Sequence, residues 1–455
     1  MDPLIIGLII FVAALVVLLS GIPIWLGLTT VALAALLIMA PQNMTIVPYV
    51  IYSSLDSFAL LAIPLFIFMA APLAASRASF DLYEVVHRWL HWLPGGIGVS
   101  NVIACAIFAA LCGSSPATAA AIGGIGVPEM RRRGYPPGFA CGLIAVGGTM
   151  GILIPPSITM ILYGVATETS IGKCFIAGII PGIVLASLAS IWTIFYFYFF
   201  VIKRERKAFQ QAQSDAAGAE VAIPYVLVKE KYTWRDRFTY LPRILPFLLI
   251  IFGVMGSLYL GWACPSEAAG IGAFLAFFLT MAIYRAYHRE QLKGIFSTAI
   301  SESSMILMIM AAALFFGYIL SHAYATQAMA QAVIALPLGK WGIMAVIQVF
   351  LLILGMFMPP AAIILMVSPI LLQILLPLGF DPIWFAAVMT LNMEIGLVSP
   401  PVALNLYIVK NIAPDISMTE VLKGSYPFIL CIALTIFLLC LFPQLALWLP
   451  GKMIG

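Results

Sequence analysis

A break interrupts one of the long apolar segments of this chain, at "GGTMGILIPPS" (residues 147–157). Apolar runs of about 20 residues are long enough to cross a bilayer as helices, and such runs recur in a sequence that is 63% hydrophobic and 9% charged. Glycine and proline disfavour helix, and proline also removes a backbone donor. Irregular backbone at membrane depth is tolerated only where protein or a water-filled cavity satisfies its polar groups. The chain is therefore predicted to be an all-α polytopic membrane protein with a specialised interior.

Charge and metal-binding residues exclude several functions. The net charge of +4 forms no patch of the kind that binds nucleic acid, and the four His and seven Cys residues show neither zinc-ligand spacing nor a disulfide framework. The GxxxxGK[ST] phosphate loop is missing from the sequence, which argues against ATP as the direct energy source. The broken segments contain no paired His, Asp or Glu, so we assign no catalytic residues and disfavour an intramembrane enzyme.

Hydropathy and glycine–proline punctuation divide the chain into two similar units. The first unit covers 55–201, and the second covers 297–449. The remaining segments are N-terminal helices in 1–54, a cytoplasmic loop in 202–243 and further helices in 244–296. The first apolar run is interpreted as a retained span because no basic segment precedes it.

Each unit is predicted to contain an interfacial arm, a re-entrant hairpin, a broken helix and a closing helix. In the first unit the hairpin is 97–127, the broken helix 138–165 and the closing helix 174–201. In the second unit the hairpin is 342–376 and the broken helix 383–409, followed by a final helix.

The two broken helices resemble each other in sequence. "GILIPPSITMILY" (151–163) aligns with "GLVSPPVALNLY" (396–407) at an offset of 245, and "GSSPATAA" (113–120) falls opposite "GMFMPPAA" (355–362) at an offset of about 242 to 243. Chance similarity between leucine-rich segments is the alternative. The ordered recurrence of glycine and proline favours an internal repeat.

Lysine and arginine residues predict the orientation. We place "RRR" (131–133) and "KRERK" (203–207) in the cytoplasm, as the positive-inside rule requires. The first hairpin then enters from the cytoplasmic face and the second from the opposite face. Of the 22 Lys and Arg residues, only three fall outside, namely Lys173, Lys340 and Lys452. The repeats are therefore predicted to be inverted, with both chain ends outside.

Inverted repeats with broken helices are typical of secondary transporters, whose sites lie near the membrane midplane. Unwound backbone exposes carbonyls, hydroxyl groups add hard oxygen ligands for a small cation, and helix N-termini attract an anion. The hydroxyl residues at the first hairpin and break are Ser114, Ser115, Thr118 and Thr149. These parts suit a Na+-coupled carrier of an anion.

Two points stay open from the residues alone. "GGTMG" is also compatible with a close-packing helix face. Asn392, Glu394 and Asn405 flank the second break, and polar groups at such depth are functional by default. For Glu394, the alternative to a functional role is that it is a structural helix cap beside a water-filled crevice, and the sequence favours neither.

Four motifs then identify a resemblance. "GSSPATAAAIGGIGVPEMRRRGY", "GGTMGILIPPSITMILYGVATETSIGKCFIAGIIPG", "CPSEAAGIGAFLA" and "NMEIGLVSPPVALNLY" together resemble the large membrane subunit of tripartite ATP-independent periplasmic (TRAP) transporters. The resemblance implies an elevator-type carrier of the bacterial inner membrane, with periplasmic chain ends and with 1–54 and 244–296 in a fixed scaffold. It implies uptake of an organic acid, such as a C4-dicarboxylate or sialic acid, driven by Na+ and without an organic cofactor. The implied partners are a separate small four-helix membrane subunit (Q-type), a periplasmic binding protein (P-type) and the lipid bilayer, with no nucleic acid.

The resemblance also implies site residues. One Na+ site would combine Gly113, Ser114 and Ser115 with Gly148, Thr149 and Pro155. A second would combine Gly355 and Met358 with Thr390, Gly396 and Pro400. Substrate would lie near Ser114, Thr118, Asn392 and Asn405.

The second site departs from the family pattern. Pro359 stands where an acidic residue commonly follows "GMFM" in the family. The usual "TPPVG" appears here as "SPPVA", so that Ser399 replaces a threonine and Ala403 replaces a glycine. A stand-alone Na+- or H+-coupled anion carrier of related architecture is the alternative function.

The predicted topology is testable by cysteine labelling. Arg132→Cys and Lys340→Cys lie in the two segments that the charge distribution places on opposite faces. A membrane-impermeant maleimide applied to sealed cells is expected to label the second variant only, with the unsubstituted chain as the blank for the seven native cysteines. Labelling of both variants from one side would contradict the inverted topology.

Overall fold

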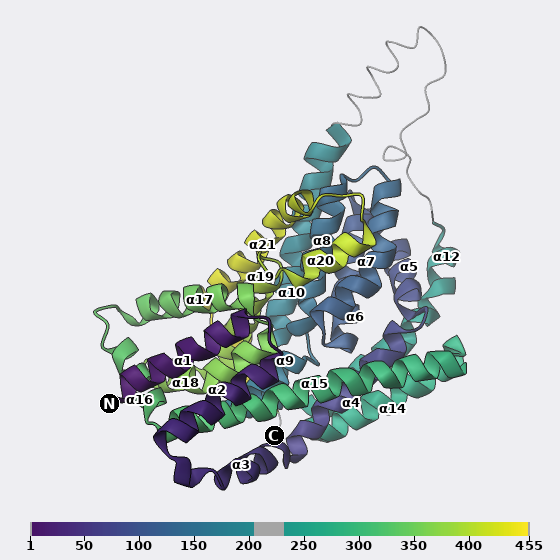
Figure 1. The fold of residues 1–455 in the computed structure, drawn as a ribbon. Helices are drawn as coiled ribbons and strands as arrows, with labels where there is room; N and C mark the ends of the chain where they lie inside the picture. Colours follow the sequence, from purple (N-terminus) through teal and green to yellow (C-terminus); the bar gives the residue numbers. More distant parts are fainter. Residues whose placement is uncertain (1, 204–231, 454–455) are drawn as a thin grey trace.

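The computed structural model describes residues 2–203 and 232–453, and these residues form helices without any strand. Six of the described helices are long and apolar enough to cross a membrane, and a seventh span results if the bent pair Ile46–Leu55 and Phe58–Ala74 counts as one. The predicted all-α polytopic fold class is confirmed. Figure 1 shows the helices packed along one another, with many of the shorter ones meeting in the middle of the molecule.

One group of helices lies outside the two repeats or before their hairpins. These helices are α1 (Pro3–Leu19), α2 (Ile24–Met39), α3 (Ile46–Leu55), α4 (Ala62–Ala74), α13 (Leu245–Tyr259), α14 (Pro265–Tyr284) and α15 (Arg289–His322). Short 3-10 turns precede α3 and α4 at Pro41–Asn43 and Phe58–Leu61. The 34-residue α15 packs against α2, α3 and α4, while α14 packs against α4 and α13. We call this set the outer helices. In Figure 1, α15 runs beside α2, α4 and α14.

The two repeats contain the same elements in the same order. The first holds α5 (Ala78–Leu90), α6 (Gly96–Cys112), α7 (Ser115–Arg132), α8 (Pro137–Thr149), α9 (Ile158–Ala166) and α10 (Ile171–Tyr196), which continues as a π-helical turn to Val201. The second holds α16 (Ala325–Ile334), α17 (Lys340–Phe357), α18 (Pro360–Leu375), α19 (Pro382–Leu397), α20 (Leu404–Ile412) and α21 (Met418–Leu441). Corresponding helices begin 244 residues apart at Gly96 and Lys340, and 247 apart at Ile171 and Met418.

Both hairpins turn where the sequence predicts a break. At the first tip, Gly113 adopts a left-handed φ of 60° and Ser114 is extended, and α7 then begins with a proline in its first turn. At the second tip, Met358 and Pro359 are extended before α18 begins at Pro360. Glycine after a helix and proline at the start of the next are the residues that such turns favour.

The polar stretch that the sequence assigns to a cytoplasmic loop, 202–243, contains an additional helix. α12 (Trp234–Tyr240) starts with a capping box in which Thr233 and Asp236 bond each other's backbone groups, and a 3-10 turn (Leu241–Ile244) joins it to α13. Most of "KRERK" and the rest of 204–231 lie outside the described residues. After α21 the chain ends in α22 (Gln444–Leu447) and a 3-10 turn at Pro450–Lys452.

Contacts between the repeats hold them together as one core. α8 of the first repeat packs against α21 of the second, and their backbones meet at glycines: a Cβ on Gly142 would lie 2.2 Å from the carbonyl carbon of Gly424. The Tyr163 hydroxyl donates to the Pro382 carbonyl at 2.8 Å. At the ends of α7 and α20, the two guanidinium nitrogens Nη1 and Nη2 of Arg131 contact the two carboxylate oxygens of Asp415 at 3.1 and 2.6 Å.

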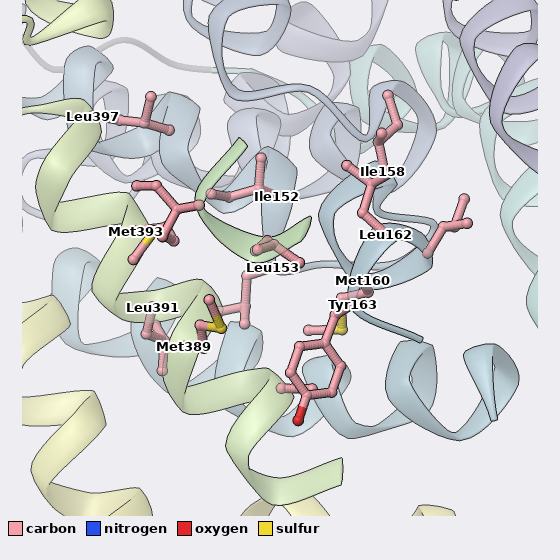
Figure 2. Packing of buried hydrophobic residues seen from close by; sticks show 14 of the residues in the cluster. Ile152, Leu153, Ile158, Met160, Leu162, Tyr163, Met389, Leu391, Met393 and Leu397 are labelled. Atoms are coloured by element: carbon pink, nitrogen blue, oxygen red, sulfur yellow. The ribbon is translucent and has the colours of Figure 1, made fainter. Parts of the chain in front are cut away.

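An apolar cluster fills the space between the first break and α19. Figure 2 shows Ile152 and Leu153 on one side and Met389 and Met393 on the other, and all four side chains are buried. Such packing makes the broken helix of one repeat part of the other repeat's core.

The glycine contact between α8 and α21 is testable with a matched pair of substitutions. Gly142→Ala places a methyl group against backbone that cannot move aside, and overpacking of this kind costs about 1–3 kcal/mol. Gly124→Ala, on α7, meets nothing within 4 Å and gains helix propensity. Thermal denaturation of the purified chain in detergent is expected to show a lower Tm for Gly142→Ala only. An equal Tm for both variants would contradict the close crossing.

Candidate functional site

The first break lies between α8 and α9 and is buried. A 3-10 turn (Met150–Ile152) follows α8, and the irregular residues 153–157 follow, with a cis bond between Pro155 and Pro156. The Ile152 carbonyl accepts hydrogen bonds from the hydroxyls of Ser157 and Thr159, the latter at 2.9 Å. The sequence interpretation did not select these two hydroxyls. The sequence marks these two hydroxyl residues only by their position, within three residues after the second proline.

The first hairpin tip rests on this break. A Cβ on Gly113 would lie 2.7 Å from the Pro156 carbonyl oxygen, and a Cβ on Gly151 would lie 2.6 Å from the Ser114 carbonyl oxygen. Both glycines are therefore required for the backbones to approach. The structure thus brings the tip residues Gly113, Ser114 and Ser115 onto the segment that contains Pro155.

Gly148 and Thr149 lie at the end of α8, next to the same tip. A Cβ on Gly148 would lie 2.6 Å from the Cβ of Ala119 on α7. The buried Thr149 hydroxyl donates to the Val146 carbonyl at 2.7 Å. The lone pairs of the Thr149 hydroxyl oxygen remain available to accept a hydrogen bond or to coordinate a cation.

The second tip and break repeat this arrangement with more exposure. Gly355 and Gly396 are in backbone contact, since a Cβ on Gly396 would lie 2.6 Å from the Gly355 carbonyl oxygen. The Val402 N–H donates to the Met356 carbonyl at 3.1 Å. Met358 and Thr390 are buried, but Pro400 is exposed. Thr390 donates to the Ala386 carbonyl within its own helix at 2.8 Å.

Asn405, on α20 of the second repeat, reaches the first hairpin. Its Nδ2 donates to the Ser115 hydroxyl at 2.7 Å and to the Ala145 carbonyl at 2.9 Å. Thr118 donates to the Ser114 carbonyl at 2.9 Å, so three of the four predicted substrate residues gather at this tip. The fourth, Asn392, donates to the Gln348 side chain on α17 at 2.7 Å. The Oδ1 atoms of Asn392 and Asn405 are buried without a hydrogen-bond partner among the described residues.

Helix ends give each tip and break a characteristic polarity. α6 and α8 end at the first site, and α17 and α19 end at the second. Helix C-termini carry partial negative charge and favour cations. α7, α18 and α20 begin there without a side-chain cap, so their free N–H groups favour an anion. The geometry therefore offers cation and anion positions side by side.

Glu394 lies in the last turn of α19, and its side chain is 0% exposed. Neither carboxyl oxygen has a hydrogen-bond partner in the described part of the chain. It therefore caps no helix, and the interpretation as a structural cap beside a crevice is wrong. Its polar neighbour is the Thr149 side chain.

A cavity of about 390 Å³ lies between some of the outer helices and the repeats, which pack directly on each other elsewhere, as α15 does on α18 and α1 on α16. Its walls come from α3 and α15 on one side and from α9, α16 and α18 on the other. Its polar lining residues are Ser54, Tyr318, Ser321, Thr326 and Gln373. None of the predicted site residues lines it.

Comparison with known proteins identifies the family. The sequence pattern of "Tripartite ATP-independent periplasmic transporter, DctM component" matches residues 11–445. The chain is 32% identical to the C4-dicarboxylate TRAP transporter large permease protein DctM of Pseudomonas aeruginosa, over 91% of this chain and 92% of that protein. It is also 32% identical to the isethionate TRAP transporter permease protein DctMQ of Oleidesulfovibrio alaskensis, over 95% of this chain and 64% of that protein.

Among solved structures, the YdaH transporter of Alcanivorax borkumensis has a similar fold. The TM-score is 0.59 at 13% sequence identity, and the match covers 91% of this chain and 90% of that chain. At this identity the likeness concerns the fold alone.

The link between Asn405 and Ser115 is testable by a double-mutant cycle. Asn405→Ala and Ser115→Ala each remove one partner of the buried hydrogen bond, and the double variant removes both. We expect a coupling energy of about 1 kcal/mol, because the second substitution loses nothing more from this bond. Unfolding in mixed detergent–SDS micelles measures it. Additive effects of the two substitutions would show that the bond contributes no stability.

Proposed function

The chain belongs to the DctM-component family of tripartite ATP-independent periplasmic transporters and is a large permease subunit, and on this premise we propose that it couples uptake of a small organic acid to Na+. The single observation that carries the proposal is the meeting of each hairpin tip with a broken helix. There, unwound backbone, buried side-chain oxygens and helix ends converge in the interior of a membrane protein.

The cation position is supported by the negative ends of α6 and α8 and by unpartnered oxygen. At the first site, the Asn405 Oδ1 atom is buried and free to accept, and the Ser115 and Thr149 hydroxyls lie in the same region. Hard oxygen ligands of this kind suit Na+. We therefore propose the first tip and break as the stronger Na+ site, with Gly113, Ser114 and Pro155 contributing backbone.

The anion position is supported by the uncapped starts of α7, α18 and α20. The two relatives are named for C4-dicarboxylate and isethionate transport, and both substrates are small organic anions. We propose a carboxylate substrate near Ser114, Thr118, Asn392 and Asn405. Neutral N–H and amide donors bind it without an ion pair, so it can leave again.

An elevator movement is supported by the packing. The Gly142–Gly424 and Arg131–Asp415 contacts hold the repeats together, and the cavity of about 390 Å³ lies between this core and α3 and α15. We propose that the core slides against the outer helices and carries substrate and Na+ across the membrane.

The partners follow from the family and from one relative. The name of the DctMQ protein and its additional sequence beyond the part that this chain matches support a small membrane subunit as a partner. We propose that this subunit joins the outer helices in the bacterial inner membrane, and that a periplasmic binding protein delivers the substrate.

Reconstituted uptake tests the proposed function. Proteoliposomes with the chain, its small subunit and a substrate-loaded binding protein are expected to accumulate substrate only under an inward Na+ gradient. A K+ gradient of equal size is the control for membrane potential and osmotic effects. Equal uptake under K+ would contradict Na+ coupling, and uptake without the binding protein would favour the stand-alone carrier.

A further inference from the structure

We propose that the Glu394 carboxylate is a ligand of the Na+ ion bound at the first tip and break, contributed by the second repeat. This inference rests on the proposed Na+ coupling and adds to it the charged member of the site. It goes beyond the residues that the motifs assign, all of which are neutral.

The position of Glu394 leaves its carboxyl oxygens free to bind a cation. The side chain is 0% exposed, and neither Oε1 nor Oε2 has a partner within 2–203 or 232–453. The ion pairs between described residues involve the acidic side chains Asp81, Glu84, Glu129 and Asp415. A buried carboxyl group keeps its charge only where a positive charge and oxygen or nitrogen partners compensate it, and otherwise takes up a proton.

The helix around Glu394 also favours a cation. Glu394 lies in the last turn of α19, where the helix carries partial negative charge and where no basic residue is present. A carboxylate there is opposed by the helix dipole. A bound cation would compensate both the carboxylate and the helix end.

Contacts place the carboxylate at the first site. Its polar neighbour is Thr149, which ends α8 and belongs to the first site, and α19 packs directly on α8 and on the 3-10 turn that follows it. The two tips and the two breaks, 112–117, 355–362, 153–157 and 398–403, contain no Asp or Glu. Glu302 also lies near the tip, beside Cys112, but it is exposed, so Glu394 is the buried acidic side chain that this packing brings to the first site.

The arrangement has a structural consequence for ion binding. Thr149 belongs to the first repeat and Glu394 to the second, so one Na+ ion would join the two repeats directly. Ion binding would then stabilise the assembled core as a whole, which makes thermal stability a readout independent of transport.

The test is a sodium titration of thermal stability. The purified full-length chain in detergent is titrated with NaCl against choline chloride at constant ionic strength, and Tm is followed by tryptophan fluorescence. Wild type is expected to gain Tm with Na+. Glu394→Gln is expected to raise the Na+ midpoint at least tenfold, while its Tm in choline is no lower than that of wild type, since the amide has the same shape and no ion pair is lost. A wild-type midpoint in Glu394→Gln would overturn the proposal.

Two further variants complete the experiment. Glu168→Gln makes the same charge change at an exposed residue just beyond α9 and is expected to keep the wild-type midpoint. An equal increase in both variants would indicate a long-range charge effect and overturn ligation. If Glu394→Gln does not fold, Glu394→Asp carries the test: withdrawing the carboxylate by one methylene is expected to raise the midpoint at least threefold, and an unchanged midpoint overturns the proposal.

The proposed function and this inference fail in different ways. If wild type shows no Na+-specific gain in Tm over choline, Na+ coupling is contradicted and Glu394 with it. If wild type responds to Na+ and Glu394→Gln responds equally, only the role of Glu394 is contradicted.

Discussion

Backbone hydrogen bonding at membrane depth is the constraint on which this structure depends. Each break frees carbonyl and amide groups that hydrocarbon cannot satisfy, so protein must approach closely enough to do so. At the first break the Ser157 and Thr159 hydroxyls donate to the Ile152 carbonyl, and the hairpin tip at Gly113 packs against the backbone of Pro156. The same approach that satisfies the breaks concentrates oxygen atoms and helix ends in one place. The proposed binding region is thus a direct consequence of how the breaks are tolerated.

The two repeats meet this constraint unequally. The first break is buried and its sequence matches the family motif, whereas Pro400 and Pro401 of the second are exposed. Ala403 adopts a left-handed φ of 40°, a conformation that favours glycine and costs other residues about 1–2 kcal/mol. The replacement of the motif glycine by alanine is therefore a local structural cost. The second repeat also contributes Asn405 to the first tip, so the repeats have the same order of elements but unequal local structure.

The positions of glycine and proline predicted where helices end and break, because these residues affect the backbone conformation of their own segment. The hairpins at Gly113 and Met358 and the breaks at both proline pairs follow from residue type alone.

Helix α12 was not predicted, because its capping box is weak evidence inside a polar stretch. The partners of Asn405 could not be predicted either, since they lie 290 and 260 residues away in sequence. Nor could the burial of Glu394, because a glutamate near a helix end is equally compatible with a solvent-facing cap. Long-range packing decides such residues, and a single sequence does not encode it in any local pattern.

The bond between Asn405 and the Ala145 carbonyl also bears on how the protein is made. These residues are 260 positions apart, and synthesis proceeds at about 5–20 residues per second. The first repeat therefore resides in the membrane for roughly tens of seconds before the side chain that completes its site has been translated. During that interval the Ser115 hydroxyl and the Ala145 carbonyl lack the donor that they have in the folded chain. Closure of the contact between the repeats at Asn405 therefore comes late in synthesis, and a truncation before Asn405 lacks the donor of both bonds.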